Sequence, residues 1–215
     1  MQGKGLSHSF ARYVTKQRWM SYYYQIKECV DSTSKSILVI GKGDGIVPVI
    51  LKQVLEREKD AAEIENTIID TFDYDDRLHP TYVGDIRDLS RIVKKKYDCV
   101  ICCQVLEHLP WDCFESIVQN IKSICNYKFI LSLPLNRRSF QMRLDICHLT
   151  YRFINIVIER KWVKNFPYKG EHYWEAGIKG HTKKDILYII KKYYDVENDY
   201  VIPENTYHWF VICHV

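Results

Sequence analysis

The sequence has no long hydrophobic run. Its longest strongly apolar stretches, CVICCQVL and KFILSLP, have the length of a strand and fall well short of the ~20 residues that a membrane-spanning helix needs. The N-terminal segment MQGKGLSHSFARYVTKQRW contains no apolar region of the kind found in secretory signal peptides. These absences predict a cytoplasmic protein without a transmembrane segment, and they leave peripheral contact with a membrane open.

The sequence also has little excess charge of either sign. A net charge of +4 over 215 residues is too mild for a dedicated DNA-binding domain, so nucleic acid is not an expected partner. Hydrophobic residues make up 47% of the chain and charged residues 27%, which are ordinary values for a globular protein. Because this length suffices for one full core and no internal repeat is present, we expect a single domain over residues 1–215.

A metal-binding cysteine pattern is missing as well. Cys99 and Cys102 form a CxxC pair, but the apolar residues between them are typical of a buried strand, where residues three apart face opposite ways. No second pair at zinc-knuckle spacing accompanies them. The eight cysteines are therefore predicted to be free, reduced thiols, and no metal site is predicted.

The chain does contain a regular alternation of strand-length apolar runs and helix-length amphipathic segments. Helices are expected at 46–60 and 111–126, and strands at 37–40, 66–73, 81–85, 97–106 and 127–134. Pro48 is tolerated because it falls in the first turn of its helix. Alternation of this kind favours an α/β fold with a mostly parallel sheet.

The two ends of the chain add different elements. Aromatic and aliphatic residues at helical spacing over 10–30 predict a helix or two, within an N-terminal cap formed by residues 1–35. Near the C-terminus, Thr182 is placed to cap a helix, and two strands follow at 195–202 and 206–215. Their connection is too short for a parallel crossover, so these strands are expected to pair antiparallel.

Between residues 135 and 180 the periodic pattern loosens, and we interpret this stretch as a variable insertion on the substrate side. Its basic and aromatic content suits a lid over an anionic or lipid-linked substrate. A solvated basic face with aromatic side chains tucked beneath it explains the same composition. The residues concerned are Arg137, Arg138, Arg143, Arg152, Arg160, Lys161, Lys164 and Lys169 together with Phe140, Phe153, Trp162, Phe166 and Tyr168.

A glycine-rich turn follows the first predicted strand in SILVIGKGDGIVPVIL. Its glycines are Gly41, Gly43 and Gly45, and they would let backbone N–H groups and a helix N-terminus approach a ligand at the carboxyl end of the sheet. The dinucleotide motif GxGxxG has its third glycine where this chain has Ile46. The turn alone therefore does not separate a nucleotide site from an ordinary strand-to-helix turn.

Polar residues follow the next strands as well. Asp73, close behind Asp70 at the end of the second strand, can accept hydrogen bonds from both hydroxyls of a ribose. Asp85, at the end of the third strand, can accept one from the exocyclic amine of an adenine, and Gln104 ends the fourth. A single acid of this kind is more often a loop cap. Acid or glycine features at three successive strand ends favour a nucleoside site instead.

Three segments together resemble the class I S-adenosylmethionine-dependent methyltransferases. They are ILVIGKGDG, DTFDYDDRLHPTYVGDIRDL and YDCVICCQVLEHLP. The resemblance implies a Rossmann-like three-layer sandwich whose seven-stranded sheet is mostly parallel with an antiparallel C-terminal strand. It also implies S-adenosylmethionine as the cofactor and methyl transfer as the activity.

Two further segments, YVTKQRWMSYYYQI and GEHYWEAGIKGHTKKDI, are similar to patterns in a bacterial and archaeal branch of this family. The resemblance thus covers nearly the whole chain and is weakest over 135–170. It implies that Gly41, Gly43 and Gly45 contact the methionine part of the cofactor and that Asp73 contacts the ribose. Asp85 would contact the adenine, and Gln104 would contact the region beside the sulfonium.

Histidines and carboxylates near the strand ends are the candidates for a general base toward the acceptor. We select His172, Glu175 and His108, with His148 and His181 as further candidates. One alternative is that Tyr173 and Trp174 are core residues while Glu171 and His172 cap the following helix. The other is that His108 supports the start of the helix after the fourth strand.

The expected function is methyl transfer to oxygen or nitrogen of a small-molecule, glycan or lipid-linked acceptor. The family's acid two residues before the first glycine is Val39 here, which keeps open a catalytically inactive cofactor-binding or scaffold protein. A nicotinamide-dependent oxidoreductase is less consistent with the missing third glycine and the antiparallel C-terminal pair. The absence of an Asn-Pro-Pro-Tyr type of tetrapeptide disfavours base methylation, and the sequence does not predict the oligomeric state.

Overall fold

A computed structural model of the chain describes residues 15–30, 34–58, 67–146, 150–164, 166–168 and 170–215. Seven strands of this part form one sheet, in the order β3-β2-β1-β4-β5-β9-β8. Their bounds are β1 Ser36–Ile40, β2 Ile68–Asp73, β3 Tyr82–Val83, β4 Tyr97–Cys103, β5 Cys125–Pro134, β8 Asp195–Ile202 and β9 Asn205–His214.

The strand directions match the sequence-based prediction. All neighbouring pairs from β3 to β5 are parallel, whereas β9 runs antiparallel to both β5 and β8. The reversal follows from the connection between β8 and β9, which is too short to carry the chain back for a parallel strand. The predicted fold class, a mostly parallel sheet with an antiparallel C-terminal strand, is confirmed.

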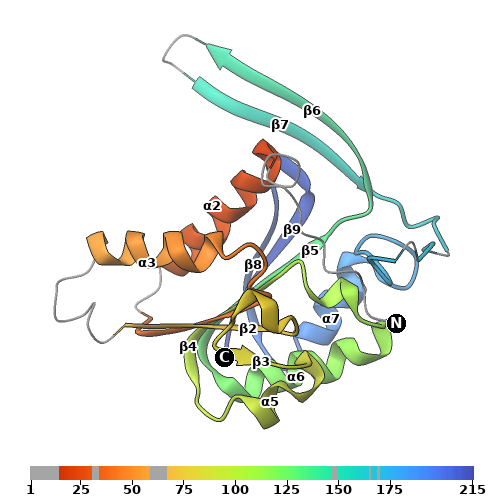
Figure 1. Cartoon of the computed structure of the whole chain (residues 1–215). Helices are drawn as coiled ribbons and strands as arrows, with labels where there is room; N and C mark the ends of the chain where they lie inside the picture. The colour runs from red at the N-terminus through yellow and green to blue at the C-terminus, as the bar shows by residue number, and fades with distance from the viewer. Residues whose placement is uncertain (1–14, 31–33, 59–66, 147–149, 165, 169) are drawn as a thin grey trace.

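Helices cover both faces of this sheet, which makes the molecule a three-layer sandwich (Figure 1). On one face lie α2 Lys16–Val30 and α3 Ile46–Glu58, and their apolar residues pack against Ile37 and Ile101 of the sheet. The other face is covered by α5 Leu89–Ile92, α6 Phe114–Ile124 and α7 Lys183–Ile190.

Strand β4 contributes to both of these cores. Cys99 packs with the α2 and α3 side, and Cys102 packs with the α6 and α7 side. The CxxC pair therefore faces opposite ways, as the sequence predicts. The described cysteines are free thiols, and Cys147 lies outside the described residues.

Two local predictions about helix starts are also confirmed. Pro48 lies in the first turn of α3, where its missing N–H costs no helical hydrogen bond. The Thr182 side chain accepts a hydrogen bond from the Asp185 backbone, and the Asp185 carboxylate accepts one from the Thr182 backbone. This capping box fixes where α7 begins.

Residues 137–146 and 150–159 do not form the irregular stretch that the sequence suggested. They form a β-hairpin, β6 Arg137–Ile146 and β7 Thr150–Glu159, which extends away from the sheet in Figure 1. Phe140, Ile154 and Ile156 on its outer side are exposed. On the inner side Gln141 donates a hydrogen bond to the Pro203 carbonyl, as does Asn155 (3.0 Å).

The prediction failed here because the apolar residues of the hairpin face outward. A core-facing strand buries its apolar side, whereas this hairpin exposes most of its described apolar residues and contacts the molecule through polar side chains such as Asn155, with Val157 packed against the core. The assignment of residues 1–35 as a cap and 135–180 as a substrate-side insertion stays a prediction. No helix within the described part of the chain has the length and apolarity needed to cross a membrane.

Asp70 lies within β2 rather than at its end, opposite Leu38 of β1. Its carboxylate accepts a hydrogen bond from the Tyr97 hydroxyl at 2.6 Å and lies 2.5 Å from the Lys95 ammonium. Burial alone would raise the pKa of Asp70, but the hydrogen bonds from Lys95 and Tyr97 outweigh it and the pKa is lowered. Asp70 is therefore part of the structural framework.

Replacing Asp70 should destabilise the fold in a pH-dependent way. Asp70→Asn should lower the free energy of unfolding by about 1–3 kcal/mol at neutral pH, because it leaves the Tyr97 and Lys95 groups imperfectly paired. Because the pKa of Asp70 is lower in the folded state, its ionised carboxylate stabilises the fold at pH values above the unfolded pKa of about 4. This stabilisation is lost as the pH falls through the folded-state pKa. Urea unfolding across that range should show the wild-type advantage shrinking, whereas the exposed Asp112→Asn control should show none.

Candidate functional site

The glycine turn lies between β1 and α3 at the carboxyl edge of the sheet. Gly41 donates its N–H to the Phe72 carbonyl of β2 at 2.8 Å. Gly41, Gly43 and Gly45 have φ values of +80°, +53° and +75°, which side chains other than glycine rarely adopt. The three glycines thus let the chain turn sharply while its N–H groups stay near the strand ends.

A neighbouring side chain also leaves no room for a larger residue at Gly41. A Cβ atom at this position would lie 2.4 Å from Cγ2 of Val105, in the loop that follows β4. By contrast, a Cβ at Gly43 would meet nothing closer than 4.0 Å. The first glycine therefore sets how closely the β4 loop approaches the turn.

Asp73, at the end of β2, is in direct contact with this turn. Its carboxylate accepts hydrogen bonds from the Gly43 N–H at 3.3 Å and from the Asp75 N–H at 3.1 Å. The residue is only 7% exposed. Each carboxylate oxygen has a further lone pair, so the group can accept additional hydrogen bonds from a ligand. The structure thus brings Asp73 and the glycines together, and the ribose contact stays a prediction.

Helix α2 closes the turn from above, a contact that the sequence did not reveal. The Tyr22 hydroxyl donates a hydrogen bond to Asp44 at 2.6 Å, and Asp44 also accepts one from the Ile46 N–H at 3.1 Å. Tyr22 and Asp44 lie on separate elements, and only the packing of α2 against α3 joins them. The YYYQ part of the N-terminal motif was the one feature of the sequence that could have pointed to this contact.

Asp85 has the capping role that the sequence left as the alternative. It is the N-cap of a short 3-10 helix, η2 Ile86–Asp88, and accepts a hydrogen bond from the Arg87 N–H. The Arg87 guanidinium contacts both of its oxygens, and these hydrogen bonds lower the pKa of Asp85. Asp85 lies at the correct edge of the sheet, but its carboxylate is already engaged, so the adenine contact stays a prediction.

Gln104 follows β4 in a left-handed conformation with φ of +58°. Its N–H donates to the Ser132 carbonyl at 2.9 Å, and its side-chain amide donates to the Ser132 hydroxyl at 3.2 Å. Non-glycine residues at positive φ are uncommon overall, and those that occur are concentrated at functional sites. The position of Gln104 beside the sulfonium stays a prediction.

Val39 occupies a fully apolar position. It is 3% exposed and packs with Leu51 and Ile101 in the core beneath α2 and α3. An acid at this position would need a buried partner, and the cluster around it is composed of apolar residues and thiols. The chain instead carries Asp44 within the turn itself, held by Tyr22.

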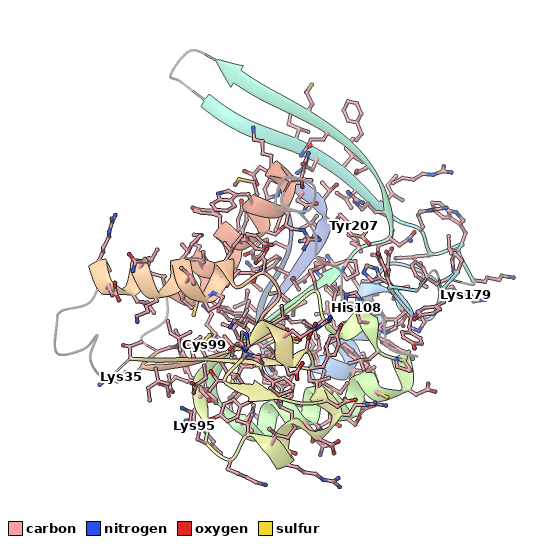
Figure 2. All side chains as sticks on the ribbon, viewed as in Figure 1. Lys35, Lys95, Cys99, His108, Lys179 and Tyr207 are labelled. Carbon is pink, nitrogen blue, oxygen red and sulfur yellow. The ribbon has the colours of Figure 1, made fainter. Side chains whose placement is uncertain are left out.

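Two of the predicted histidines meet at this edge. The ring centroids of His108 and His172 lie 4.9 Å apart in an edge-to-face arrangement. His108, labelled in Figure 2, ends the short 3-10 helix η3 Leu106–His108 after β4. Neither histidine caps a helix, because α7 is capped by Thr182 and the His108 ring contacts the Glu171 carbonyl. Trp174 does belong to the core, as the alternative had it, and the catalytic roles of His108 and His172 stay predictions.

Each ring is oriented by a hydrogen bond at Nδ1. The His108 Nδ1 lies 3.0 Å from the Glu171 carbonyl oxygen, and the His172 Nδ1 lies 3.2 Å from the Glu175 carboxylate. Burial lowers the pKa of His108. Burial also acts to lower the pKa of His172, but the hydrogen bond with Glu175 and the charge of Glu107 outweigh it, so that pKa is raised.

Glu107 lies directly beneath the two rings and was not among the predicted site residues. Its side chain is fully buried, and neither carboxylate oxygen has a hydrogen-bond partner among the described residues. One oxygen lies 4.0 Å from the Nε2 atoms of both His108 and His172. Burial raises the pKa of Glu107 to about 7.

Glu175 is surrounded by donors instead. It accepts hydrogen bonds from His172, from the Asn136 amide at 2.8 Å and from the hydroxyl of Tyr207, which Figure 2 labels. Burial alone would raise the pKa of Glu175, but these hydrogen bonds outweigh it and the pKa is lowered. With its oxygens occupied, Glu175 is suited to orienting His172.

Backbone hydrogen bonds bring residues 171–176 to the sheet edge. The Tyr173 N–H donates to the Glu107 carbonyl at 2.8 Å, and the Ala176 N–H donates to the Pro134 carbonyl at 2.9 Å. Trp174 is buried and donates its indole N–H to the Leu109 carbonyl at 3.0 Å. Of the other histidine candidates, His181 packs against the Trp111 ring outside the pair, and His148 lies outside the described residues.

The basic stretch near the hairpin is partly engaged in structural contacts. The Arg137 guanidinium donates two hydrogen bonds to the Thr206 hydroxyl and lies over the Tyr207 ring. Arg138 lies over the Trp162 ring, 5.3 Å from its centroid. These contacts resemble a basic face resting on aromatic side chains, and a lid over an anionic substrate stays a prediction.

Comparison with known proteins identifies the fold. No protein-family model and no curated protein sequence matches the chain. Solved structures do match, and one is magnesium protoporphyrin IX methyltransferase (ChlM) from Synechocystis PCC 6803 with bound SAM. It has a TM-score of 0.60 and 14% identity, and the match covers 99% of this chain and 86% of that one.

A second match is the N-methyltransferase NodS from Bradyrhizobium japonicum WM9 with S-adenosylhomocysteine, with a TM-score of 0.56, 8% identity and coverage of 98% and 93%. A third is a S-adenosylmethionine-dependent methyltransferase from Clostridium acetobutylicum ATCC 824, with a TM-score of 0.55, 11% identity and coverage of 96% and 94%. The chain has the class I methyltransferase fold. In this methyltransferase fold the glycine turn, Asp73 and the histidine pair all lie at the carboxyl edge of the sheet.

The close approach at Gly41 can be separated from its backbone strain. Gly41→Ala and Gly180→Ala place alanine at nearly the same φ, +80° and +83°, but only the first has a neighbour within 4 Å. Both should cost about 1–2 kcal/mol of strain, and Gly41→Ala should cost about 1–3 kcal/mol more from overpacking against Val105. Urea unfolding measures both values.

A Val105→Ala background provides the control for this comparison. It removes the contacting methyl group and should bring the cost of Gly41→Ala down toward that of Gly180→Ala. Equal destabilisation by the two glycine substitutions in the wild-type background would contradict the crowding argument.

Proposed function

We propose that this protein transfers a methyl group from S-adenosylmethionine to an oxygen or nitrogen atom of a small-molecule, glycan or lipid-linked acceptor. The observation that carries the proposal is that the glycine turn, Asp73 and a histidine–carboxylate cluster around buried Glu107 share one edge of a methyltransferase sheet. The first two suit a nucleoside-bearing cofactor, and the third suits the acceptor.

The cofactor side is supported by the shape of the turn. Gly41 and Gly43 allow the backbone to pass close under a ligand, and Asp73 is rigidly placed by the Gly43 and Asp75 amides with lone pairs left over for ribose hydroxyls. S-adenosylmethionine supplies an activated methyl group on its sulfonium. The residues of this chain therefore act mainly by positioning.

On the acceptor side, we assign His108 and His172 to contact the acceptor and Glu175 to position His172. The two Nε2 atoms point into the same space, and each ring is held by a separate hydrogen bond at Nδ1. A hydroxyl acceptor would lie against these nitrogens, which can take its proton as its oxygen accepts the methyl group. Gln104, held at positive φ, would lie between the two halves of the site.

Two other functions predict different behaviour. A catalytically inactive protein would bind the adenosyl ligands without turnover, and the apolar Val39 is the observation behind it. A nicotinamide-dependent oxidoreductase would bind NADH, but β9 inserts antiparallel between β5 and β8, as the methyltransferase sheets require. We regard the first alternative as the stronger of the two.

Ligand titration tests the proposal. Calorimetry should show micromolar binding of S-adenosylmethionine and S-adenosylhomocysteine and no binding of NADH. Asp73→Asn should weaken adenosyl binding about 10- to 100-fold, because it removes a charged acceptor of ribose hydrogen bonds. Asp75→Asn is the matched control, since that neighbouring acid is occupied by Arg77 and should leave the affinity unchanged.

The possible outcomes separate the three functions. Adenosyl binding that survives Asp73→Asn would show that the ligand does not use this edge of the sheet. Binding of NADH alone would select the oxidoreductase. Tight adenosyl binding, with no methylated product from a broad panel of hydroxyl and amine acceptors, would favour the inactive protein.

A further inference from the structure

Three side chains beside the histidine pair direct hydrogen-bond acceptors at one another. They belong to Glu107, His108 and His172. Their ligand atoms, one from each side chain, all lie within 4.8 Å of each other. The carboxylate oxygen of Glu107 is 4.0 Å from Nε2 of His108 and 4.0 Å from Nε2 of His172. These separations are too long for hydrogen bonds.

The hydrogen bonds at Nδ1 define which ring nitrogens carry lone pairs. A backbone carbonyl can only accept, so the His108 Nδ1 facing Glu171 must carry the proton. The His172 Nδ1 faces the Glu175 carboxylate and donates to it in the same way. In the neutral rings both Nε2 atoms are therefore acceptors, and both face Glu107.

Glu107 adds a third acceptor to the same space. Its side chain is fully buried, with no hydrogen-bond partner for either oxygen among the residues that the structure describes. An unpaired buried carboxylate is costly, and in proteins such groups are paired or bind metal ions. Three acceptors that converge in this way favour a cation between them, either a proton on Glu107 or a metal ion.

The arrangement has two other properties of a metal site. Histidine ligands usually donate their remaining N–H to a carboxylate or a backbone carbonyl, as His172 and His108 do here. The His108 side chain is 49% exposed, which leaves a path from solvent to the buried carboxylate. Ligands at about 2.1 Å from a metal lie about 3.4 Å apart. The separations here, 4.0 Å for the two Glu107–histidine pairs and at most 4.8 Å overall, would therefore shorten by about 0.6 to 1.4 Å on binding.

We propose that Glu107, His108 and His172 bind a divalent transition-metal ion. Two imidazoles and one carboxylate with open positions suit Zn²⁺, Co²⁺, Fe²⁺ or Mn²⁺. The sequence predicted no metal site because these ligands come from two distant segments, which the hydrogen bond from the Tyr173 N–H to the Glu107 carbonyl joins. Metal binding itself does not depend on the proposed reaction.

A metal at this position would define the acceptor class, an inference that rests on the proposed function. An acceptor hydroxyl that occupies an open coordination position has a lowered pKa. Its proton passes to solvent water, its oxygen bonds to the methyl carbon, and the sulfur keeps the electron pair of the broken bond. The ring nitrogens then act as ligands, and the favoured acceptors are oxygen compounds able to coordinate the metal.

Direct titration of the tag-free protein, first treated with a chelator, tests this site. Calorimetry with Zn²⁺ and the absorption spectrum with Co²⁺ should each report one equivalent bound with nitrogen ligation. Glu107→Gln and His172→Asn should abolish this binding, and Glu175→Gln should weaken it about 10- to 100-fold by releasing the His172 ring. His214→Asn is the matched control, since His214 also faces a carboxylate, Glu197, but without a third ligand.

Thermal unfolding supplies a second readout. Metal should raise the melting temperature of the wild type and of His214→Asn but not of Glu107→Gln. Without metal, Glu107→Gln should melt at the wild-type temperature or above, because it removes an unpartnered buried carboxylate. A melting transition of Glu107→Gln at that temperature would also show that the variant is folded.

Titration of S-adenosylhomocysteine into the metal-free protein separates this proposal from the proposed function. Adenosyl binding without any metal binding would overturn the metal site and leave methyl transfer in place. Metal binding without adenosyl binding would support the metal site and overturn methyl transfer as the proposed function. Metal binding that persists in Glu107→Gln would place the ion elsewhere and overturn the assignment.

Discussion

The whole arrangement depends on the parallel pairing of β1, β2, β4 and β5. Parallel strands end at the same edge of a sheet, so every loop that follows one of them meets the others there. The glycine turn, Asp73 and the β4 loop are neighbours for this reason. The 2.4 Å approach that a Cβ at Gly41 would make to Val105 shows how closely these loops are packed.

The acceptor side is built by a second constraint, the attachment of residues 171–176 to this edge. This segment pairs with the residues after β5 and with the carbonyl of Glu107, and buried Trp174 anchors it against Leu109. His172 is thereby carried into contact with the His108 ring, and the Nε2 atoms of both rings lie 4.0 Å from the same oxygen of Glu107. The hydrogen bonds of Glu175 with Asn136 and Tyr207 then hold it in place. The candidate chemistry is thus a product of tertiary packing more than of any one loop.

These two constraints explain what the sequence could predict. The parallel strands and the antiparallel β8–β9 pair follow from local patterns and loop lengths. The contact of Asp73 with the glycine turn follows from strand ends meeting at one edge. The β6–β7 hairpin escaped prediction because its apolar residues, such as Phe140 and Ile156, face outward. The burial of Glu107 depends on segments that are distant in sequence, and no local pattern reports it.

A crystal structure of the protein with S-adenosylhomocysteine would test the central claim most directly, namely that one edge of the sheet holds both cofactor and acceptor groups. The account predicts the ligand over the glycine turn, its ribose on Asp73 and its sulfur facing the space between Gln104 and the histidine pair. A ligand bound elsewhere, or one whose sulfur faces away from His108 and His172, would contradict it.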